Sequence, residues 1–317
     1  MTAIPTAKDG LTLEKLATPK VRTPWNDTFR RLRRHRSAQV GAFILGCLVL
    51  IAIFAPVLAP FDPYRQLRDS KRRSGPCIHL LGCPADQPEH FFGIDSNSRD
   101  LLSRVIYGSR LSLIVGFSTV TFAIVIGTVL GAIAGYSGGM LDNIIMRIMD
   151  VLLAFPSLLL SIAIVTVLGR GLEKALLAIA FVSIPVYARI VRASVLQVKE
   201  LDFVSASRAL GASGLSTLLS HIMPNAVTPL IVQATLGIAS AILDAAALSF
   251  LGLGAPPPTP EWGLMLGEER NSIFNAPHLV VFPGIAIMLT VLAFNLLGDG
   301  LRDALDPRLS QVGIKAG

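Results

Sequence analysis

The sequence is poor in charged residues. Asp, Glu, Lys and Arg make up 15% of its 317 residues, whereas hydrophobic residues make up 52%. A soluble domain carries about 25% charged residues, so this composition indicates a membrane protein. Six runs contain none of the four charged residue types: 37–61, 111–141, 151–169, 175–188, 209–243 and 279–298.

These runs predict an all-α, multi-pass membrane protein with six transmembrane helices. A spanning helix needs about 20 apolar residues, and five of the runs are long enough as they stand. The fourth run reaches that length when Leu172 or Ile190 is added at one end. The fifth span is placed at 226–254, after a more polar stretch, and Phe155-Pro156 predicts a kink in the third.

Enzyme motifs are absent from the sequence. There is no G-x-x-x-x-G-K-[ST] P-loop, no G-x-S-x-G, no H-E-x-x-H and no glycine-rich dinucleotide turn. The five histidines are scattered, with no pair at ligand spacing on a helix. We therefore expect no catalytic residue, no metal and no bound cofactor, and energy must come from an ion gradient or another polypeptide.

Cysteine is scarce, with three residues in the chain. Cys77 and Cys83 lie between the first two spans, with His79 between them. A disulfide is the leading interpretation, free thiols come next, and a metal site is least favoured because C-x5-C does not match common zinc spacings. Cys47 lies in the first span and is interpreted as a packing residue.

Basic residues gather before the first span, and the chain carries a net charge of +7. Arginines at 30, 31, 33, 34 and 36 place the N-terminus in the cytoplasm, and six spans return the C-terminus to the same side. A topology signal explains this charge better than nucleic-acid binding does. No cleavable signal peptide is visible.

The predicted organisation has five parts. Residues 1–36 form a cytoplasmic tail ending in an interfacial helix over 23–36, in which Trp25, Phe29 and Leu32 share one face. The first span covers 37–61 and an extracytoplasmic segment covers 62–107. A five-helix core covers 108–302, and a cytoplasmic tail covers 303–317.

The stretch 201–225 interrupts the apolar core and predicts a hairpin of two short helices. Gly211 can take the left-handed conformation that ends a helix, Ser213 can cap the next one, and Pro224 closes the segment. Such a hairpin outside the lipid suits docking onto another protein. An ordinary connecting loop is the alternative.

Few ionisable residues lie in or near the spans. Arg147 is expected to pair with Asp150 or Asn143 at helical spacing. Asp244 lies inside the fifth span, where a carboxyl faces either a substrate pathway or another helix, and Asp150 is a second candidate for a position in the pathway or at a helix interface. Trp262, in the loop APPPTPEWG, is expected at the membrane interface.

Several motifs resemble the permeases of binding-protein-dependent ABC importers. Ser205–Gly211 with HIMPN at 221–225 resembles their cytoplasmic coupling signature: Ala206, Gly211 and Pro224 match it, whereas Ser205, Ser207 and Met223 depart from it. The segments SRALGAS, AALSFLGLGAPPPTPEWG and LAFNLLGDGLRDALDPRL resemble one branch, the second permease subunit of dipeptide, oligopeptide and nickel importers. Asp95 and residues 99–108 also match this branch, with Ser98 in place of its usual glycine.

The resemblance implies a type I importer fold in a bacterial or archaeal cytoplasmic membrane. It implies a heterodimer with a related permease, two ABC ATPase subunits that carry ATP and Mg²⁺, and an extracytoplasmic substrate-binding protein. ATPase coupling would involve the following residues: Ser205, Ala206, Ser207, Arg208, Ala209, Gly211, Ala212 and Pro224. Dipeptides, longer peptides, glutathione and chelated nickel are all compatible substrates.

Two other classes of function compete with this one. An ion-coupled secondary transporter would carry more buried ionisable groups than Asp244 alone. A membrane scaffold would use the hairpin to recruit a soluble partner without transporting anything. Uptake by the isolated chain would favour the first, and a lack of substrate-dependent ATPase activity would favour the second.

Overall fold

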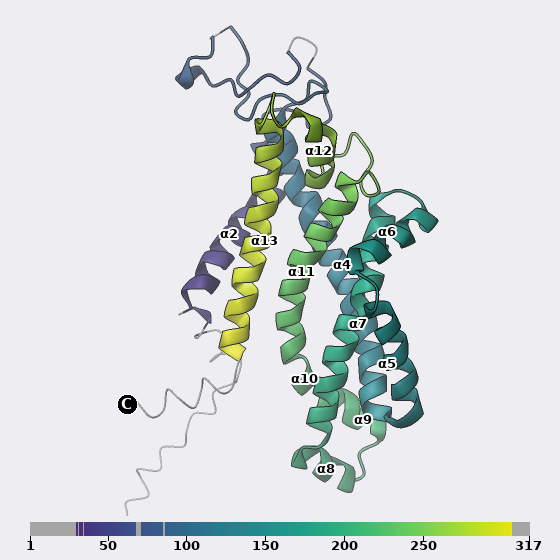
Figure 1. Ribbon diagram of the computed structural model, residues 1–317. Coiled ribbons are helices and arrows are strands. Elements are labelled where there is room, and N and C mark those ends of the chain that lie inside the picture. The colour runs from purple at the N-terminus through teal and green to yellow at the C-terminus, as the bar shows by residue number, and fades with distance from the viewer. Residues whose placement is uncertain (1–29, 31, 34, 68–70, 85, 306–317) are drawn as a thin grey trace, which may run out of the picture.

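The computed structural model describes residues 30, 32–33, 35–67, 71–84 and 86–305 (Figure 1). The predicted N-terminal tail, much of the predicted helix over 23–36 and most of the predicted tail at 303–317 lie outside these residues. Within them the chain is helical and forms no strand, although Cys77 pairs with His90 and Ile94 with Asp100 in isolated bridges.

Five helices are long and apolar enough to cross a membrane: α2 (Arg36–Ile53), α4 (Leu101–Ser137), α7 (Leu172–Lys199), α11 (Thr228–Phe250) and α13 (His278–Leu305). A sixth candidate span is a bent pair, α5 (Gly139–Leu153) and α6 (Ser157–Leu168), whose axes differ by 92°. Pro156 lies at the bend. It explains the bend, because the residue before a proline is driven out of the helical conformation. The predicted kink at this proline is confirmed.

The remaining helices are short and lie near the ends of the spans: α3 (Ala55–Leu58), η2 (His79–Leu81), α8 (Asp202–Ala209), α9 (Gly214–Thr217), η3 (Leu218–Ile222), α10 (Met223–Ala226), α12 (Trp262–Glu269) and η4 (Arg270–Ser272).

Several boundaries differ from the sequence prediction: α2 ends at Ile53 rather than at 61, and α13 continues past the predicted border at 302/303 to Leu305. Helix α4 begins at Leu101, because the Asp100 carboxylate accepts a hydrogen bond from the Ser103 backbone N–H at 2.8 Å and caps the first turn. The predicted border at 107/108 therefore lies inside α4. Helix α11 ends at Phe250, before Gly252 adopts a φ of +77°, so the span does not run to Gly254.

Helices α4 and α7 form the tightest seam of the molecule. Three glycines of α4, spaced by four residues, face α7 with no room for a side chain: Gly127 against Tyr187, Gly131 against Ala188 and Val191, and Gly135 against Arg192 and Val195. Small residues at this spacing let membrane helices approach at backbone distance. The α4–α7 pair is therefore the rigid centre to which the other spans attach.

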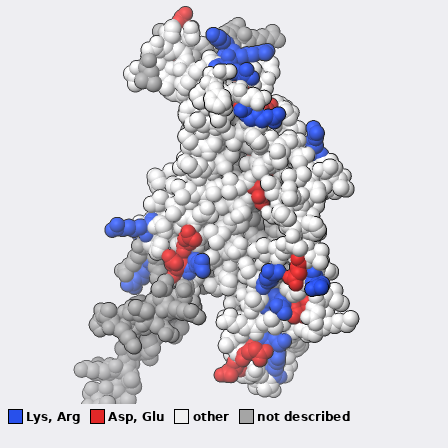
Figure 2. Space-filling model, in the orientation of Figure 1, with Lys and Arg blue, Asp and Glu red and all other residues white. Residues whose placement is uncertain are grey.

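The two ends of the helix bundle carry different structures (Figure 1). One end, called here the hairpin end, carries α8 and α9 within the hairpin, residues 201–225. The opposite end carries α12 and, beside it, residues 62–100. Only residues 62–100 are called the cap here. Figure 2 shows Lys, Arg, Asp and Glu gathered toward the ends, with an isolated acidic group in the otherwise uncharged middle. This charge distribution is the one that a bilayer requires of a spanning protein.

Candidate functional site

The hairpin contains two helical segments that meet at a glycine. The end of α8 is closed by two backbone hydrogen bonds, from Gly211 to the Arg208 carbonyl at 3.0 Å and from Ala212 to the Ser207 carbonyl at 3.2 Å. Gly211 has a φ of +90°, which L-residues other than glycine rarely adopt. The Ser213 hydroxyl then accepts the Ser216 backbone N–H at 3.3 Å and caps α9. The structure shows both the glycine turn and the serine cap expected from the sequence.

Past α9 the hairpin returns to the membrane through one π-helical turn, η3. Its Met223 backbone N–H bonds to the Leu218 carbonyl five residues earlier. Pro224 has no N–H to donate, which favours a local departure from the regular α-helical pattern. Pro224 is exposed, whereas Ile222 and Ala226 on either side are buried. This turn sets the direction in which the chain enters α11.

An open groove of about 480 Å³ lies between α8 and the segment that follows it. It is lined by Phe203, Ala206, Ser207, Leu210, Gly211, Ala212 and His221. Leu210 on its rim is 89% exposed, and Leu215 and Leu219 of the same hairpin are also exposed, so the hairpin presents several large apolar side chains to its surroundings. Four predicted coupling residues line this groove, and Ser205, Arg208 and Ala209 lie exposed on the same helix.

Tyr136 holds the hairpin against the end of α4. The Arg208 guanidinium lies over the Tyr136 ring, 5.7 Å from its centre, and the Tyr136 hydroxyl lies 3.0 Å from where a Cβ on Gly214 would be. The Tyr136 carbonyl accepts a hydrogen bond from the Lys199 ammonium at 3.4 Å. Sequence reasoning missed this role of Tyr136, because its contacts come from residues 63 to 78 positions later.

Two ion pairs join α5 to α7 above the hairpin. Arg192 donates two hydrogen bonds to the Asp142 carboxylate, at 2.5 and 2.6 Å, and Arg189 donates one to Asp150 at 2.7 Å. The predicted pairing of Arg147 with Asp150 is therefore wrong. The close packing of α7 on α4 brings its arginines to both carboxylates, so a cross-helix pair replaces the local one.

Asp244 lies on α11 at the border between its buried and exposed faces. Ala245 and Leu248 on one side are buried, whereas Leu243 on the other is 46% exposed. No residue in the described part of the chain makes a hydrogen bond or ion pair with the Asp244 carboxylate. A contact between helices of this chain therefore does not account for it.

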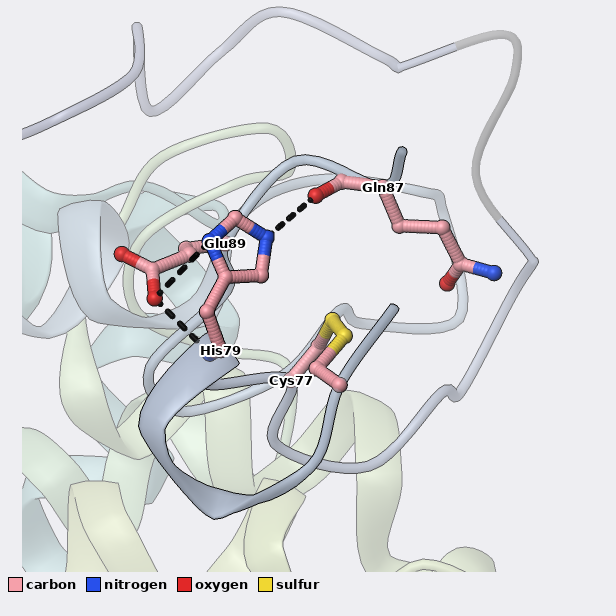
Figure 3. The surroundings of a disulfide bond; sticks show 5 residues. Cys77, His79, Gln87 and Glu89 are labelled. Atoms are coloured by element: carbon pink, nitrogen blue, oxygen red, sulfur yellow. Dashed lines mark hydrogen bonds and ion pairs between the residues drawn. A yellow bond between two sulfur atoms is a disulfide. The ribbon is translucent and has the colours of Figure 1, made fainter. Parts of the chain in front are cut away.

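The cap is closed by a disulfide between Cys77 and Cys83 (Figure 3). His79 braces the same loop, since its backbone N–H donates to the Glu89 carboxylate at 2.8 Å and its ring lies 2.8 Å from the Gln87 carbonyl. Cys47, in contrast, is exposed on the single chain, so the helices of this chain do not bury it as the predicted packing residue.

A buried ionic cluster fixes the cap to α12. The Arg99 guanidinium bonds to Asp95 at 2.6 Å and to Glu268 at 3.0 Å. Arg104, with no exposed surface, donates to the carbonyls of Pro63 and Pro258. Ser98 adopts a φ of +59°, which explains why a glycine suits this position.

The start of α12 is buried rather than interfacial. Trp262 is 1% exposed, its indole N–H donates to the Val105 carbonyl at 3.0 Å, and its ring lies against Gly108. The prediction that Trp262 marks the membrane interface is therefore wrong. Glu261 caps α12 by accepting the backbone N–H groups of Gly263 and Leu264; burial raises the pKa of this carboxyl, and the two donors partly oppose that shift.

Comparison with known proteins decides the family. Residues 127–311 match the model of the binding-protein-dependent transport system inner membrane component, and residues 23–76 match the N-terminal TM domain of oligopeptide transport permease C. The chain belongs to this family of ABC importer permeases. The permease is similar to the dipeptide transport system permease protein DppC of Alkalihalophilus pseudofirmus, with 50% identity over 90% of this chain and 91% of that protein.

Other relatives agree with this assignment. The glutathione transport system permease protein GsiD of Escherichia coli is 48% identical over 92% of both chains. A solved structure of the MetNI methionine ABC transporter, in an inward-facing conformation, aligns with a TM-score of 0.55 at 19% identity, covering 65% of this chain and 98% of that one. The permease therefore has the type I importer fold, and its family is one of transport proteins rather than enzymes.

Proposed function

We propose that this permease forms half of the translocation pathway of an ATP-driven importer of dipeptides, oligopeptides or glutathione-like peptides. The observation that carries this proposal is the hairpin, with its exposed Leu210 and its groove of about 480 Å³. Two ABC ATPase subunits, which bind ATP and Mg²⁺, dock there, and a related second permease completes the pathway. An extracytoplasmic binding protein delivers substrate at the cap end.

The structure supports a mechanical role for the hairpin. Helix α7 leads into α8 with two residues between them, and Tyr136 ties the hairpin to α4. A force applied at the groove is therefore transmitted to the α4–α7 pair. The two helices are in contact at backbone distance along the glycine seam, so they move together. A rigid element of this kind converts closure of the ATPases into rotation of the spans.

Peptides are favoured as substrates because the two relatives carry the names of dipeptide and glutathione transporters. Both substrates are short peptides with a free ammonium group and free carboxylates. Neither name favours chelated nickel, which the resemblance alone left open, and membership of the family disfavours an ion-coupled transporter.

The coupling role is tested with the complex of both permeases and the ATPases in proteoliposomes. Gly211→Pro cannot keep a φ of +90° or donate to the Arg208 carbonyl, and Ala206→Glu places a charge in the groove. We expect both variants to insert and assemble but to lose most peptide uptake per ATP hydrolysed. Gly46→Ala, where a methyl group meets open space, is the matched control. Normal ATP-driven uptake by both hairpin variants would refute the coupling assignment.

The orientation is a separate part of the proposal. We place this permease in the cytoplasmic membrane of a bacterium or archaeon, with both termini and the hairpin in the cytoplasm. A green fluorescent protein fused after Gly317 folds and fluoresces in the cytoplasm and fails to do so after export by the general secretory route. If a fusion of full length and normal abundance did not fluoresce, the C-terminus would lie outside the cytoplasm and the proposed orientation would be wrong.

A further inference from the structure

Helix α11 carries a narrow polar face. At 100° per residue, Gln233, Ser240 and Asp244 fall within about 40° of one another in helical projection. Ser240, at one edge of this face, is exposed, whereas Gln233 at its centre and Asp244 at its other edge are half-buried. Asp244 is the only charged residue of α11, a helix described along its whole length. Figure 2 shows that charged groups are scarce in the middle of the molecule, between its two ends.

On this polar face the Ser240 hydroxyl donates to the Leu236 carbonyl at 3.4 Å, whereas the Asp244 carboxylate is not satisfied by any residue that the structure describes. Two aspartates of α5 are paired, Asp142 with Arg192 and Asp150 with Arg189, whereas Asp244 has no partner among the described residues. A carboxylate facing hydrocarbon is costly. This face is therefore directed at water, at a second protein or at a transported molecule.

The polar face lies near the end of α11 that is on the same side of the molecule as the cap. Asp244 lies six residues before the end of α11, a rise of about 9 Å. Leu251, two turns after Asp244 on the same face, lines an open hollow of about 370 Å³ at that end. The hollow is bordered by Arg170 and Arg270, and both are exposed. Asp244 does not line this hollow itself and lies about two helical turns from Leu251 along the same face of the helix.

We propose that Asp244 is a cation-selecting residue of the translocation pathway and binds the ammonium group of a passing peptide. The proposal rests on the function proposed above, since a pathway requires the second permease to enclose this face. A carboxylate and an ammonium group form a charge-assisted hydrogen bond, and in a site of low dielectric constant the carboxylate also repels anions. Peptides with a free N-terminus would therefore pass Asp244 more readily than anions would.

The test measures the charge preference of the pathway without using the binding protein. Ser240→Cys places a thiol one helical turn from Asp244, in a background in which Cys47→Ala removes the exposed thiol and Cys77 and Cys83 stay joined. In the assembled importer, the thiol is treated with a cationic trimethylammonium-ethyl methanethiosulfonate and with the anionic sulfonatoethyl reagent. The quantity compared is the ratio of the two modification rates.

We expect Asp244→Asn to lower this ratio about tenfold, because removing a negative charge one turn away disfavours the cation and favours the anion. Asp244→Glu should keep the ratio, and Glu173→Gln, which removes an exposed charge outside the pathway, should leave it unchanged. A ratio unchanged by Asp244→Asn would overturn the proposal. So would a thiol that neither reagent reaches, since Asp244 would then lie in a sealed contact with the second permease. ATP-driven peptide uptake by the wild-type importer, measured in parallel, tests the proposed function separately.

Discussion

A single methyl group at Gly131 tests whether the α4–α7 seam is the rigid centre of the permease. In Gly131→Ala the new Cβ would collide with the Ala188 backbone carbonyl and lie 2.9 Å from the Val191 Cβ. The obstacle is backbone, so rotation of a side chain cannot relieve it and the two helices must separate. Gly127 and Gly135, one turn away on either side, would then lose their own close contacts.

The free-energy cost of the collision in Gly131→Ala is obtained by comparison with an alanine substitution at a glycine that has free space around it. Overpacking of a tight core costs about 1–3 kcal/mol. Replacing glycine by alanine inside a helix also contributes about 0.5–1 kcal/mol in favour of folding. Gly46→Ala in α2 receives the same helix-forming gain without a collision, since nothing lies within 4 Å of its new Cβ. The difference between the two variants therefore isolates the overpacking cost, which we place at about 2 kcal/mol.

The assay is the apparent melting temperature of each variant, followed by size-exclusion chromatography after heating in detergent. A difference of about 2 kcal/mol corresponds to about 4–8 °C between Gly131→Ala and Gly46→Ala. Peptide uptake by Gly131→Ala should also fall, because α7 leads directly into α8. Equal melting temperatures for the two variants would refute the view that this seam is closed at backbone distance.

Three further outcomes are expected. A double-mutant cycle on Asp142 and Arg192 should give a coupling energy of about 1–2 kcal/mol, because the bidentate pair is partly buried; additive effects in the unfolding assay would contradict the pair. Replacing Cys77 and Cys83 by serine should lower the local stability of the cap by about 2 kcal/mol, seen as faster limited proteolysis there, with an unchanged cleavage rate as the opposing result. Glu261→Ala should destabilise α12 by about 1–2 kcal/mol, and a melting temperature equal to wild type would show that its two N–H contacts contribute nothing.

Local chemistry made part of the structure predictable. The runs without charge identified the spans, because a bilayer excludes unpaired charges wherever the chain folds. Pro156 and Gly211 were identified for a similar reason, since a missing N–H and a missing Cβ act on the backbone at their own positions. These features depend on a few neighbouring residues, and the structure shows both the bend at Pro156 and the turn at Gly211.

Contacts between helices could not be predicted from the sequence. Asp150 of α5 pairs with Arg189 of α7, 39 residues away. The three glycines of α4 fix which side of α7 faces α4, and this orientation of α7 brings Arg189 to Asp150. Trp262 is buried for a similar reason, since Gly108 leaves the space that its ring fills. The sequence determined that Asp244 lies inside a span. Only the packing of α11 decided which side of that helix is buried, and so left the carboxylate without a partner in the described chain.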